Sequence, residues 1–361
     1  MGSWKIACGA GSVGFRLGAT TRARLGGALF TTKPPLITVM ERRPLGNTEI
    51  EVSPIALGCW PIAGVTTLGA NEADSLATIR ACFELGINFL DTAFCYGYDG
   101  QSETLIRMAV GDRRDEMVIA TKGGLRLVRP DKQVIHDASP DALKQQCDES
   151  LRRLGTDFVE LYYLHAPDPA VPVAESAGAI RELVESGKVR AAGASNLDLE
   201  QLRAFHAVCP LTAIQPPYNM LQRGIEREIV PWCREHDISV CIYWPLMKGL
   251  LAGKLPRDHQ WDPQDGRAKY PMFQGDQWQK NMDFVDRLRE IADESGHAVA
   301  QLVVNWTLQQ PGITVALCGA KRAWQIEETA AAWDWQMTDA QVTAIDEALR
   351  ERGTAAAGRA V

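Results

Sequence analysis

Four polar residues with complementary proton chemistry stand where apolar runs of the sequence end: Asp91, Tyr96, Lys122 and His165. Carbonyl reduction needs a proton donor at the oxygen, and a phenol with a pKa of about 10 is a poor donor at neutral pH. A neighbouring ammonium favours the phenolate and is expected to lower that pKa, while an acid can hold the ammonium charged. An imidazole can donate a hydrogen bond to the substrate oxygen. The quartet therefore suggests proton transfer to a carbonyl group.

Each residue also has an ordinary structural interpretation. Asp91 could be a turn or cap residue, Lys122 a solvated loop lysine and His165 a buried, hydrogen-bonded histidine. Taken together, at the ends of three successive strand-like runs, they favour catalysis over these separate roles.

The apolar runs are short and rich in β-branched or aromatic residues, which is typical of buried parallel strands. Strand-like runs end near residues 58, 90, 121, 164, 194, 215, 243 and 317. Amphipathic stretches between them predict helices over about 71–85, 101–110, 140–153, 173–186, 198–207, 225–236 and 281–294. A hairpin over 43–52, turning at Gly46-Asn47, comes before the first of these strands.

This alternation fits either a closed barrel or a doubly wound sheet. Polar residues at several strand ends, without a credible glycine-rich first turn, favour a (β/α)₈ TIM barrel, whose chemistry lies at the carboxyl ends of its strands. We expect the barrel over residues 41–351, a flexible tail over 352–361, and a binding loop or lid over 247–280.

Residues 1–40 form a predicted N-terminal extension with five basic residues and no acid. Gly9, Gly11 and Gly14 formally match a dinucleotide fingerprint, but this motif needs a following helix and an acid about 20 residues later. The next acid is Glu41, and Pro34-Pro35 lies between. A transit-like segment and translated sequence upstream of a start at Met40 are the better interpretations.

Composition excludes several classes of function. The chain carries a net charge of −7, so the part without the five extension cations is at −12, which argues against a nucleic-acid partner. No apolar stretch approaches the roughly 20 residues of a membrane span. Nine cysteines without a C-x-x-C pair indicate a reducing, cytoplasmic location, and no metal-ligand spacing is present. Cys95, beside Tyr96, is interpreted as a small space-filling residue.

The order of the motifs along the chain resembles the aldo-keto reductase superfamily over residues 41–351. The matching segments are Asp91-Thr-Ala-x-x-Tyr96-Gly, the Lys122 strand end, Leu161-Tyr-Tyr-Leu-His165-Ala-Pro-Asp, Gly187-Lys-Val-Arg-Ala-Ala-Gly-Ala-Ser195-Asn196, Ile214-Gln215-Pro-Pro-Tyr218-Asn, Pro245-Leu-Met-Lys-Gly-Leu-Leu-Ala-Gly-Lys254 and Cys318-Gly-Ala-Lys321-Arg322. The resemblance implies an NADP(H)-dependent barrel reductase of aldehydes or ketones, with Asp91, Tyr96, Lys122 and His165 as its tetrad. Tyr96 would be the proton donor.

The resemblance also implies a cofactor site whose residue types make physical sense. Ser195, Asn196 and Gln215 end successive strands and can hydrogen-bond a nicotinamide carboxamide, while Tyr243 offers an aromatic face. The loop after Tyr243 would approach a pyrophosphate through Leu246, Lys248, Gly249, Leu251 and Gly253.

The last part of the implied cofactor site follows the final strand. Gly319 ends that strand, and Lys321 and Arg322 precede a helix expected to begin around Arg322, an arrangement suited to anions. Two cations there suit a 2′-phosphate, so NADP(H) is favoured over NAD(H); a surface charge pair is the alternative interpretation. Gln325 and Glu328 match family positions that contact adenosine.

Three residues depart from the family pattern. Trp244 stands where relatives usually have Ser, Thr329 where they often have Asn, and Phe94 where they commonly have an acid. Phe94, with Trp60 and Tyr98, predicts a rather apolar substrate mouth.

Two other functions remain open at this point. The resemblance extends to potassium-channel β subunits, which bind NADP(H) yet serve mainly as regulatory partners. A metal-dependent barrel isomerase is a further alternative, although the strand ends lack a cluster of carboxylate and histidine ligands.

Overall fold

The computed structural model describes residues 40–130 and 132–355. The predictions for residues 1–39, including the glycine fingerprint, lie outside the described residues, and the predicted tail is described only as far as residue 355.

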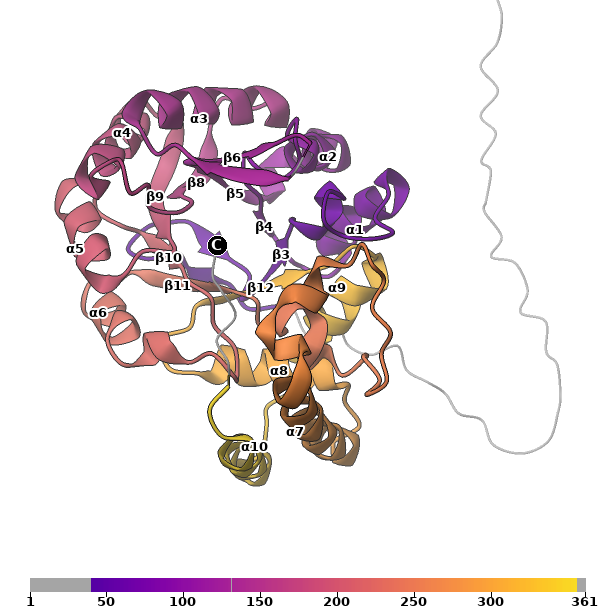
Figure 1. Ribbon diagram of the computed structural model, residues 1–361. Helices are drawn as coiled ribbons and strands as arrows, with labels where there is room; N and C mark the ends of the chain where they lie inside the picture. The colour runs from indigo at the N-terminus through magenta and orange to yellow at the C-terminus, as the bar shows by residue number, and fades with distance from the viewer. Residues whose placement is uncertain (1–39, 131, 356–361) are drawn as a thin grey trace, which may run out of the picture. The chain divides into compact units, whose positions relative to one another are not determined.

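A closed barrel of eight parallel strands forms the centre of the described chain (Figure 1). Its strands are β3 (Ile55–Gly58), β4 (Phe89–Asp91), β5 (Val118–Gly123), β8 (Val159–Leu164), β9 (Val189–Ser195), β10 (Ala213–Gln215), β11 (Ser239–Tyr243) and β12 (Val315–Gly319). Pairing of β12 with β3 closes the ring. The predicted TIM barrel is confirmed, and every barrel strand ends within two residues of its expected position.

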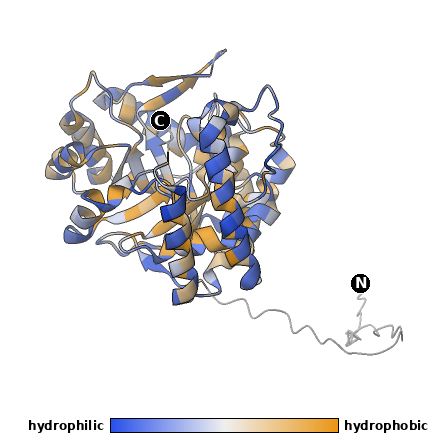
Figure 2. Cartoon of the chain, turned by 60° about the horizontal axis from the view of Figure 1, so that its bottom comes forward, coloured by the Kyte–Doolittle hydropathy of each residue, from blue (hydrophilic) through white to orange (hydrophobic). Residues whose placement is uncertain are grey.

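Helices surround the barrel strands and connect most of them (Figure 1). They are α1 (Glu72–Glu84), α2 (Gln101–Val110), α3 (Pro140–Leu154), α4 (Val173–Glu185), α5 (Leu199–Val208), α6 (Ile229–Glu235), α7 (Gly275–Glu294), α8 (Val299–Gln309), α9 (Ala323–Ala330) and α10 (Asp339–Arg352). Hydrophilic and hydrophobic residues alternate around the outer helices, while the interior strands are mainly hydrophobic (Figure 2).

Local sequence explains where these helices begin and end. The Ser139 hydroxyl accepts a hydrogen bond from the Ala142 amide and caps α3, and Gly155 ends that helix with a left-handed φ of 69°. Asp198 caps α5 in a reciprocal capping box with Gln201.

Three helices near the C-terminal end of the chain differ from expectation. Helix α7 begins at Gly275, six residues earlier than predicted, which shortens the long loop. Two short 3₁₀ turns, Gly266–Lys269 and Pro271–Phe273, directly precede this helix. Helix α8 was not predicted, because nine of its eleven residues are buried and it lacks a polar face. Helix α10, also not predicted, packs against α7.

A short hairpin covers the amino-terminal end of the barrel. It pairs β1 (Arg43–Pro44) with β2 (Glu51–Val52), as the sequence predicted. Leu45 and Val52 are fully buried and belong to the same apolar cluster as the inward-facing barrel residues. A second hairpin, β6 (Leu125–Val128) with β7 (Gln133–His136), lies in the loop after β5 and was not predicted.

Tight packing inside the barrel gives a testable prediction at Gly193 in β9. A Cβ atom there would lie 2.4 Å from the Tyr163 ring and 3.1 Å from the Ala213 carbonyl oxygen. Gly193→Ala is therefore expected to lower the free energy of unfolding by about 1–3 kcal/mol, measured by urea denaturation.

The matched control is Gly178→Ala in α4, where a Cβ meets nothing within 4 Å. That change should raise stability by about 0.5–1 kcal/mol through helix propensity. Equal effects at the two glycines would contradict the packing account.

Candidate active site

The carboxyl ends of β4, β5 and β8 bring the four predicted residues together. Asp91 ends β4, Lys122 lies near the end of β5, and His165 follows β8 directly. Tyr96 lies in the loop after β4, and its hydroxyl is 3.4 Å from the Lys122 ammonium. Its ring is edge-on to that of His165, with centroids 5.9 Å apart.

A buried ion pair forms the base of this site. The Lys122 ammonium lies 2.7 Å from Asp91 Oδ1, and the two side chains are 0% and 3% exposed. The same ammonium donates to the Thr92 carbonyl oxygen at 2.7 Å. Gln215 donates to the other Asp91 oxygen at 2.7 Å. Burial raises the pKa of Asp91, and the contacts with Lys122 and Gln215 oppose that rise.

The Tyr96 hydroxyl lies in a site that favours its protonated form. Burial raises the pKa of Tyr96 well above its usual value, and the charge of Asp91 adds to this effect. The lowered pKa expected for Tyr96 is therefore not found in this structure, since desolvation, and after it the charge of Asp91, outweigh the attraction of the Lys122 ammonium for a phenolate. Trp60 covers one side of Tyr96, with ring centroids 5.0 Å apart.

His165 is held by contacts at its backbone and its ring. Its carbonyl oxygen accepts a hydrogen bond from Asn196 at 2.9 Å, and its Nδ1 lies 3.5 Å from the Cys95 sulfur. Burial lowers the pKa of His165 well below its usual value, and the Lys122 charge acts in the same direction. The imidazole is therefore neutral at physiological pH, whereas burial raises the pKa of Cys95 to about 12.

The residues expected at a nicotinamide carboxamide form one hydrogen-bonded group. Ser195 Oγ donates to the Gln215 carbonyl at 2.7 Å, and the Tyr243 hydroxyl donates to Asn196 Oδ1 at 2.8 Å. Asn196 adopts a left-handed φ of 60°, and its amide also donates to Ser195 Oγ at 3.1 Å. These residues lie beside the tetrad, since Gln215 and Asn196 contact Asp91 and His165 directly.

The loop after β11 turns through an unusual series of left-handed residues. Trp244, Met247, Lys248, Gly249 and Gly253 all have positive φ. This path gives a tight 3₁₀ segment, Met247–Ala252, which contains most of the expected pyrophosphate residues.

The Lys248 side chain is held against aromatic rings in this part of the structure. The Lys248 ammonium lies 4.0 Å from the centroid of the Trp244 ring and 4.3 Å from that of Tyr270. Burial, and then the charge of Arg267, lower the pKa of Lys248 to about 8. The Arg267 guanidinium donates to the Lys248 carbonyl at 3.3 Å and also pairs with Asp265 at 2.7 Å.

The segment after β12 adds further cations. Lys321 and Arg322 precede α9, whose first residue is Ala323, as predicted. Burial lowers the pKa of Lys321, and the charges of Arg322 and Arg267 lower it further. Gln325 accepts a hydrogen bond from the Lys321 amide at 2.9 Å. Glu328 pairs with Lys254 at 2.6 Å, which joins α9 to the end of the β11 loop.

The three residues expected at the substrate mouth have different surroundings. Trp60 contacts Tyr96, and Tyr98 packs against the same small apolar cluster as Tyr96. The Phe94 ring instead lies 4.4 Å from the Arg153 guanidinium on α3, so its visible role is packing against the helix layer.

Sequence reasoning missed a buried network that supports the Tyr96 loop. Glu103 on α2 is fully buried, accepts a hydrogen bond from Thr121 at 2.8 Å and pairs with Arg153 at 3.2 Å. Arg153 also donates to the Phe94 carbonyl at 3.4 Å and packs so closely on Gly100 that a Cβ there would lie 2.4 Å from it. The partners are 50 positions apart, and no spacing pattern signals such a pair.

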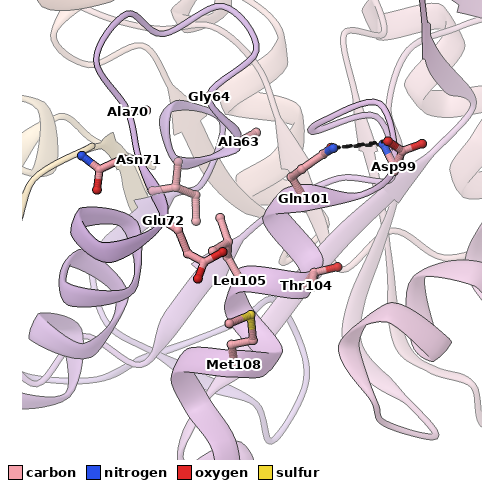
Figure 3. Close-up of a pocket in the computed structure, with 11 residues that line it drawn as sticks. Ala63, Gly64, Ala70, Asn71, Glu72, Asp99, Gln101, Thr104, Leu105 and Met108 are labelled. Carbon is pink, nitrogen blue, oxygen red and sulfur yellow. Dashed lines mark hydrogen bonds between the residues drawn. The ribbon is translucent and has the colours of Figure 1, made fainter.

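A separate surface hollow of about 280 Å³ lies between the loop after β3 and helices α1 and α2 (Figure 3). It contains none of the tetrad residues, and several of its polar side chains already have structural roles. Asn71 caps α1, Asp99 pairs with Arg129, and Gln101 bonds to Asp99. The chemistry is therefore assigned to the barrel mouth.

Within residues 40–130 and 132–355, no cluster of three or more histidine, cysteine or acidic side chains could hold a metal ion. No helix in the same part of the chain is long and apolar enough to cross a membrane.

A closed barrel with an acid, a lysine, a tyrosine and a histidine at its strand ends is an arrangement suited to an oxidoreductase. Comparison with known proteins identifies the family. The sequence profile of the Aldo/keto reductase family matches residues 54–350. The chain belongs to this family, and it is an oxidoreductase acting on carbonyl or alcohol groups with a nicotinamide cofactor.

Individual members of the family are similar to this chain over most of its length. The chain is 37% identical to aldo-keto reductase YhdN of Bacillus subtilis over 301 residues, which cover 82% of this chain and 90% of that protein. It is 32% identical to the NADH-specific methylglyoxal reductase of Escherichia coli, over 85% of this chain and 98% of that protein. The solved glycerol dehydrogenase AKR11B4 from Gluconobacter oxydans superimposes with a TM-score of 0.81 at 32% identity, over 89% and 98% of the two chains.

The pKa directions in the site predict how activity depends on pH. Because the pKa of Tyr96 is raised and that of His165 is lowered, the phenol stays protonated and the imidazole neutral from about pH 6 to 9. If Tyr96 exchanges the proton with the substrate, carbonyl reduction should show a flat kcat/KM profile across this range, whereas alcohol oxidation, which would need the phenolate, should rise towards pH 10. Stopped-flow measurements in both directions test this, and a reductive inflection near pH 6.5 would contradict the buried, neutral His165.

The buried Glu103–Arg153 pair below the Tyr96 loop predicts an effect on both stability and turnover. Glu103→Gln leaves Arg153 without its buried partner and is expected to cost about 1–3 kcal/mol of stability and to lower kcat more than it changes KM. Urea denaturation and steady-state kinetics measure the two effects.

Glu149→Gln is the matched control, because Glu149 pairs with the same Arg153 at 3.2 Å from a more exposed position. It should stay within about 1 kcal/mol of the wild type with unchanged kcat. A wild-type kcat in Glu103→Gln would show that the network does not position Tyr96.

Proposed function

We propose that this chain catalyses the reversible, NADPH-dependent reduction of an aldehyde or ketone to an alcohol, with Tyr96 as the proton donor. The observation that carries the proposal is the buried Lys122–Asp91 pair, whose ammonium lies 3.4 Å from the Tyr96 hydroxyl. A bound nicotinamide supplies the hydride for this reaction.

Proton transfer is assigned to the tetrad as follows. The substrate oxygen lies between the Tyr96 hydroxyl and His165, and the neutral imidazole donates a hydrogen bond that orients the carbonyl and stabilises its developing negative charge. Since His165 Nδ1 faces the Cys95 thiol at 3.5 Å, the other ring nitrogen is the one that addresses the substrate. Tyr96 then gives its proton to that oxygen, and the Lys122 charge stabilises the phenolate left behind.

Coenzyme binding is assigned to two groups of residues. Ser195, Asn196 and Gln215 offer hydrogen-bonding groups for a carboxamide, and Tyr243 offers a ring beside them. The phosphates are assigned to the left-handed loop that contains Lys248 and to the segment before α9.

The distribution of charge supports NADP(H) in particular. Lys248, Arg267, Lys321 and Arg322 act on one another electrostatically, and the desolvated Lys248 and Lys321 have lowered pKa values. Such a group of cations is stabilised by a polyanion. Arg267, which no motif indicated, belongs to this proposed phosphate site.

The substrate is proposed to be a small carbonyl compound that fits against Trp60. Its ring packs edge-on against Tyr96 at 5.0 Å and provides an apolar wall at the reacting group. A cytoplasmic location stays a prediction, supported by the free cysteines among the described residues, all of which are buried.

Replacing Tyr96 tests the proposed proton donor. Tyr96→Phe should lower kcat for carbonyl reduction by about 100- to 10,000-fold while NADPH affinity stays close to that of the wild type. NADPH oxidation across a panel of aldehydes, ketones, quinones and sugars, together with fluorescence titration, measures both quantities.

Tyr162→Phe is the matched control, since its hydroxyl donates to the Leu143 carbonyl at 3.0 Å in the layer between barrel and helices. It should retain turnover with a modest loss of stability. Near-normal reduction by Tyr96→Phe would refute the assignment. A wild-type protein that binds NADPH but reduces nothing in the panel would favour the regulatory alternative.

A further inference from the structure

The two cations proposed to bind the coenzyme's 2′-phosphate already have hydrogen-bond and ion-pair partners elsewhere in the chain. The Lys321 ammonium donates to the Leu68 carbonyl at 2.5 Å, and the Arg322 guanidinium donates to the Gly69 carbonyl at 3.0 Å. The guanidinium also pairs with Asp74 Oδ2 at 2.7 Å. These partners belong to the loop after β3 and to the first turn of α1.

The two cations differ in whether a carboxylate neutralises them. Arg322 has a carboxylate in contact, whereas among the described residues no ion pair is formed by Lys321. The Asp74 and Arg322 side chains are 38% and 32% exposed, so water and small ligands reach the pair. An incoming phosphate therefore meets an arginine whose charge is partly neutralised and an acid beside it.

The two nicotinamide coenzymes respond to such an acid in opposite ways. A phosphate monoester carries a charge of about −1.5 to −2 near neutral pH and is repelled by a carboxylate. The 2′-hydroxyl of NAD(H) is neutral, and a carboxylate can accept a hydrogen bond from it. A single acid at this position thus disfavours one coenzyme and favours the other.

We propose that Asp74 is a coenzyme-specificity residue, which lowers the preference of this enzyme for NADP(H) over NAD(H) by competing for Arg322. This inference rests on the proposed function, because it takes Lys321 and Arg322 as the 2′-phosphate site. It predicts that the wild type prefers NADPH over NADH less strongly than it would if Lys321 and Arg322 acted without Asp74.

Asp74→Asn isolates the charge, because the new side chain keeps an oxygen acceptor for Asn71, which donates a hydrogen bond to Asp74 in the α1 cap. Dissociation constants for NADPH and NADH, measured by nucleotide fluorescence on the same preparation, give a ratio that does not depend on the amount of folded protein. The change should shift this ratio about threefold to fivefold towards NADPH, the size expected for one partly exposed ion pair.

The matched control is Glu72→Gln, which removes an acid from the same first turn of α1, where Glu72 makes no ion pair with Arg322. Its NADPH-to-NADH ratio should equal that of the wild type. An equal shift in both variants would mean that only the general field of α1 matters, and this would overturn the inference.

Arg322→Gln separates failure of this inference from failure of the proposed coenzyme. If Arg322→Gln weakens NADPH binding but Asp74→Asn leaves the ratio unchanged, Asp74 has no role in specificity and the NADP(H) assignment stands. If Arg322→Gln and Lys321→Gln leave the affinities for both coenzymes unchanged, the assigned phosphate site is wrong, and the inference fails with it.

Discussion

The structure of the site depends on one buried ion pair, Lys122 with Asp91. Removing two charges from water costs several kcal/mol per ion unless further hydrogen bonds complete their shells. Those bonds come from Thr92 next to the acid and from Gln215, whose strand β10 lies on the opposite side of the barrel from β4. The pair is thus satisfied only when the barrel is closed, so its charge state and position are a property of the whole ring of strands.

The strand ends of the barrel and the surface loops carry different groups of the proposed site. The residues proposed for proton transfer and for carboxamide binding lie at or directly after strand ends, apart from Tyr96 in the loop after β4, and the backbone ladder fixes these strand ends to one another. The cations lie instead on the loop after β11 and before α9, and hydrogen bonds and ion pairs such as Lys254–Glu328 join these segments. Under the proposed function, the barrel fixes the reacting groups, while recognition of the distal half of the coenzyme depends on surface charges that can change without disturbing the core.

Sequence alone was sufficient for the barrel and for the grouping of the quartet. Strand ends could be located because each apolar run stops at a polar residue, as at Asp91 and His165, and parallel strands place such residues on one face. Helix α8 could not be recognised, since a helix buried on all sides has no periodicity to detect. Pairs such as Glu103 with Arg153 escaped notice because contacts across helices leave no local pattern. The raised pKa of Tyr96 could not be predicted, because residue spacing does not reveal desolvation.

Burial makes the Cys95 thiol a weak nucleophile beside the proposed active site. A thiolate next to a carbonyl compound would add to it and form a hemithioacetal, and the Cys95 sulfur lies 3.5 Å from His165 Nδ1 in the proposed active site. Burial raises the pKa of Cys95 to about 12, so its sulfur stays protonated and weakly nucleophilic at any physiological pH. The same desolvation that raises the pKa of the Tyr96 phenol thus limits addition of this thiol to a carbonyl compound.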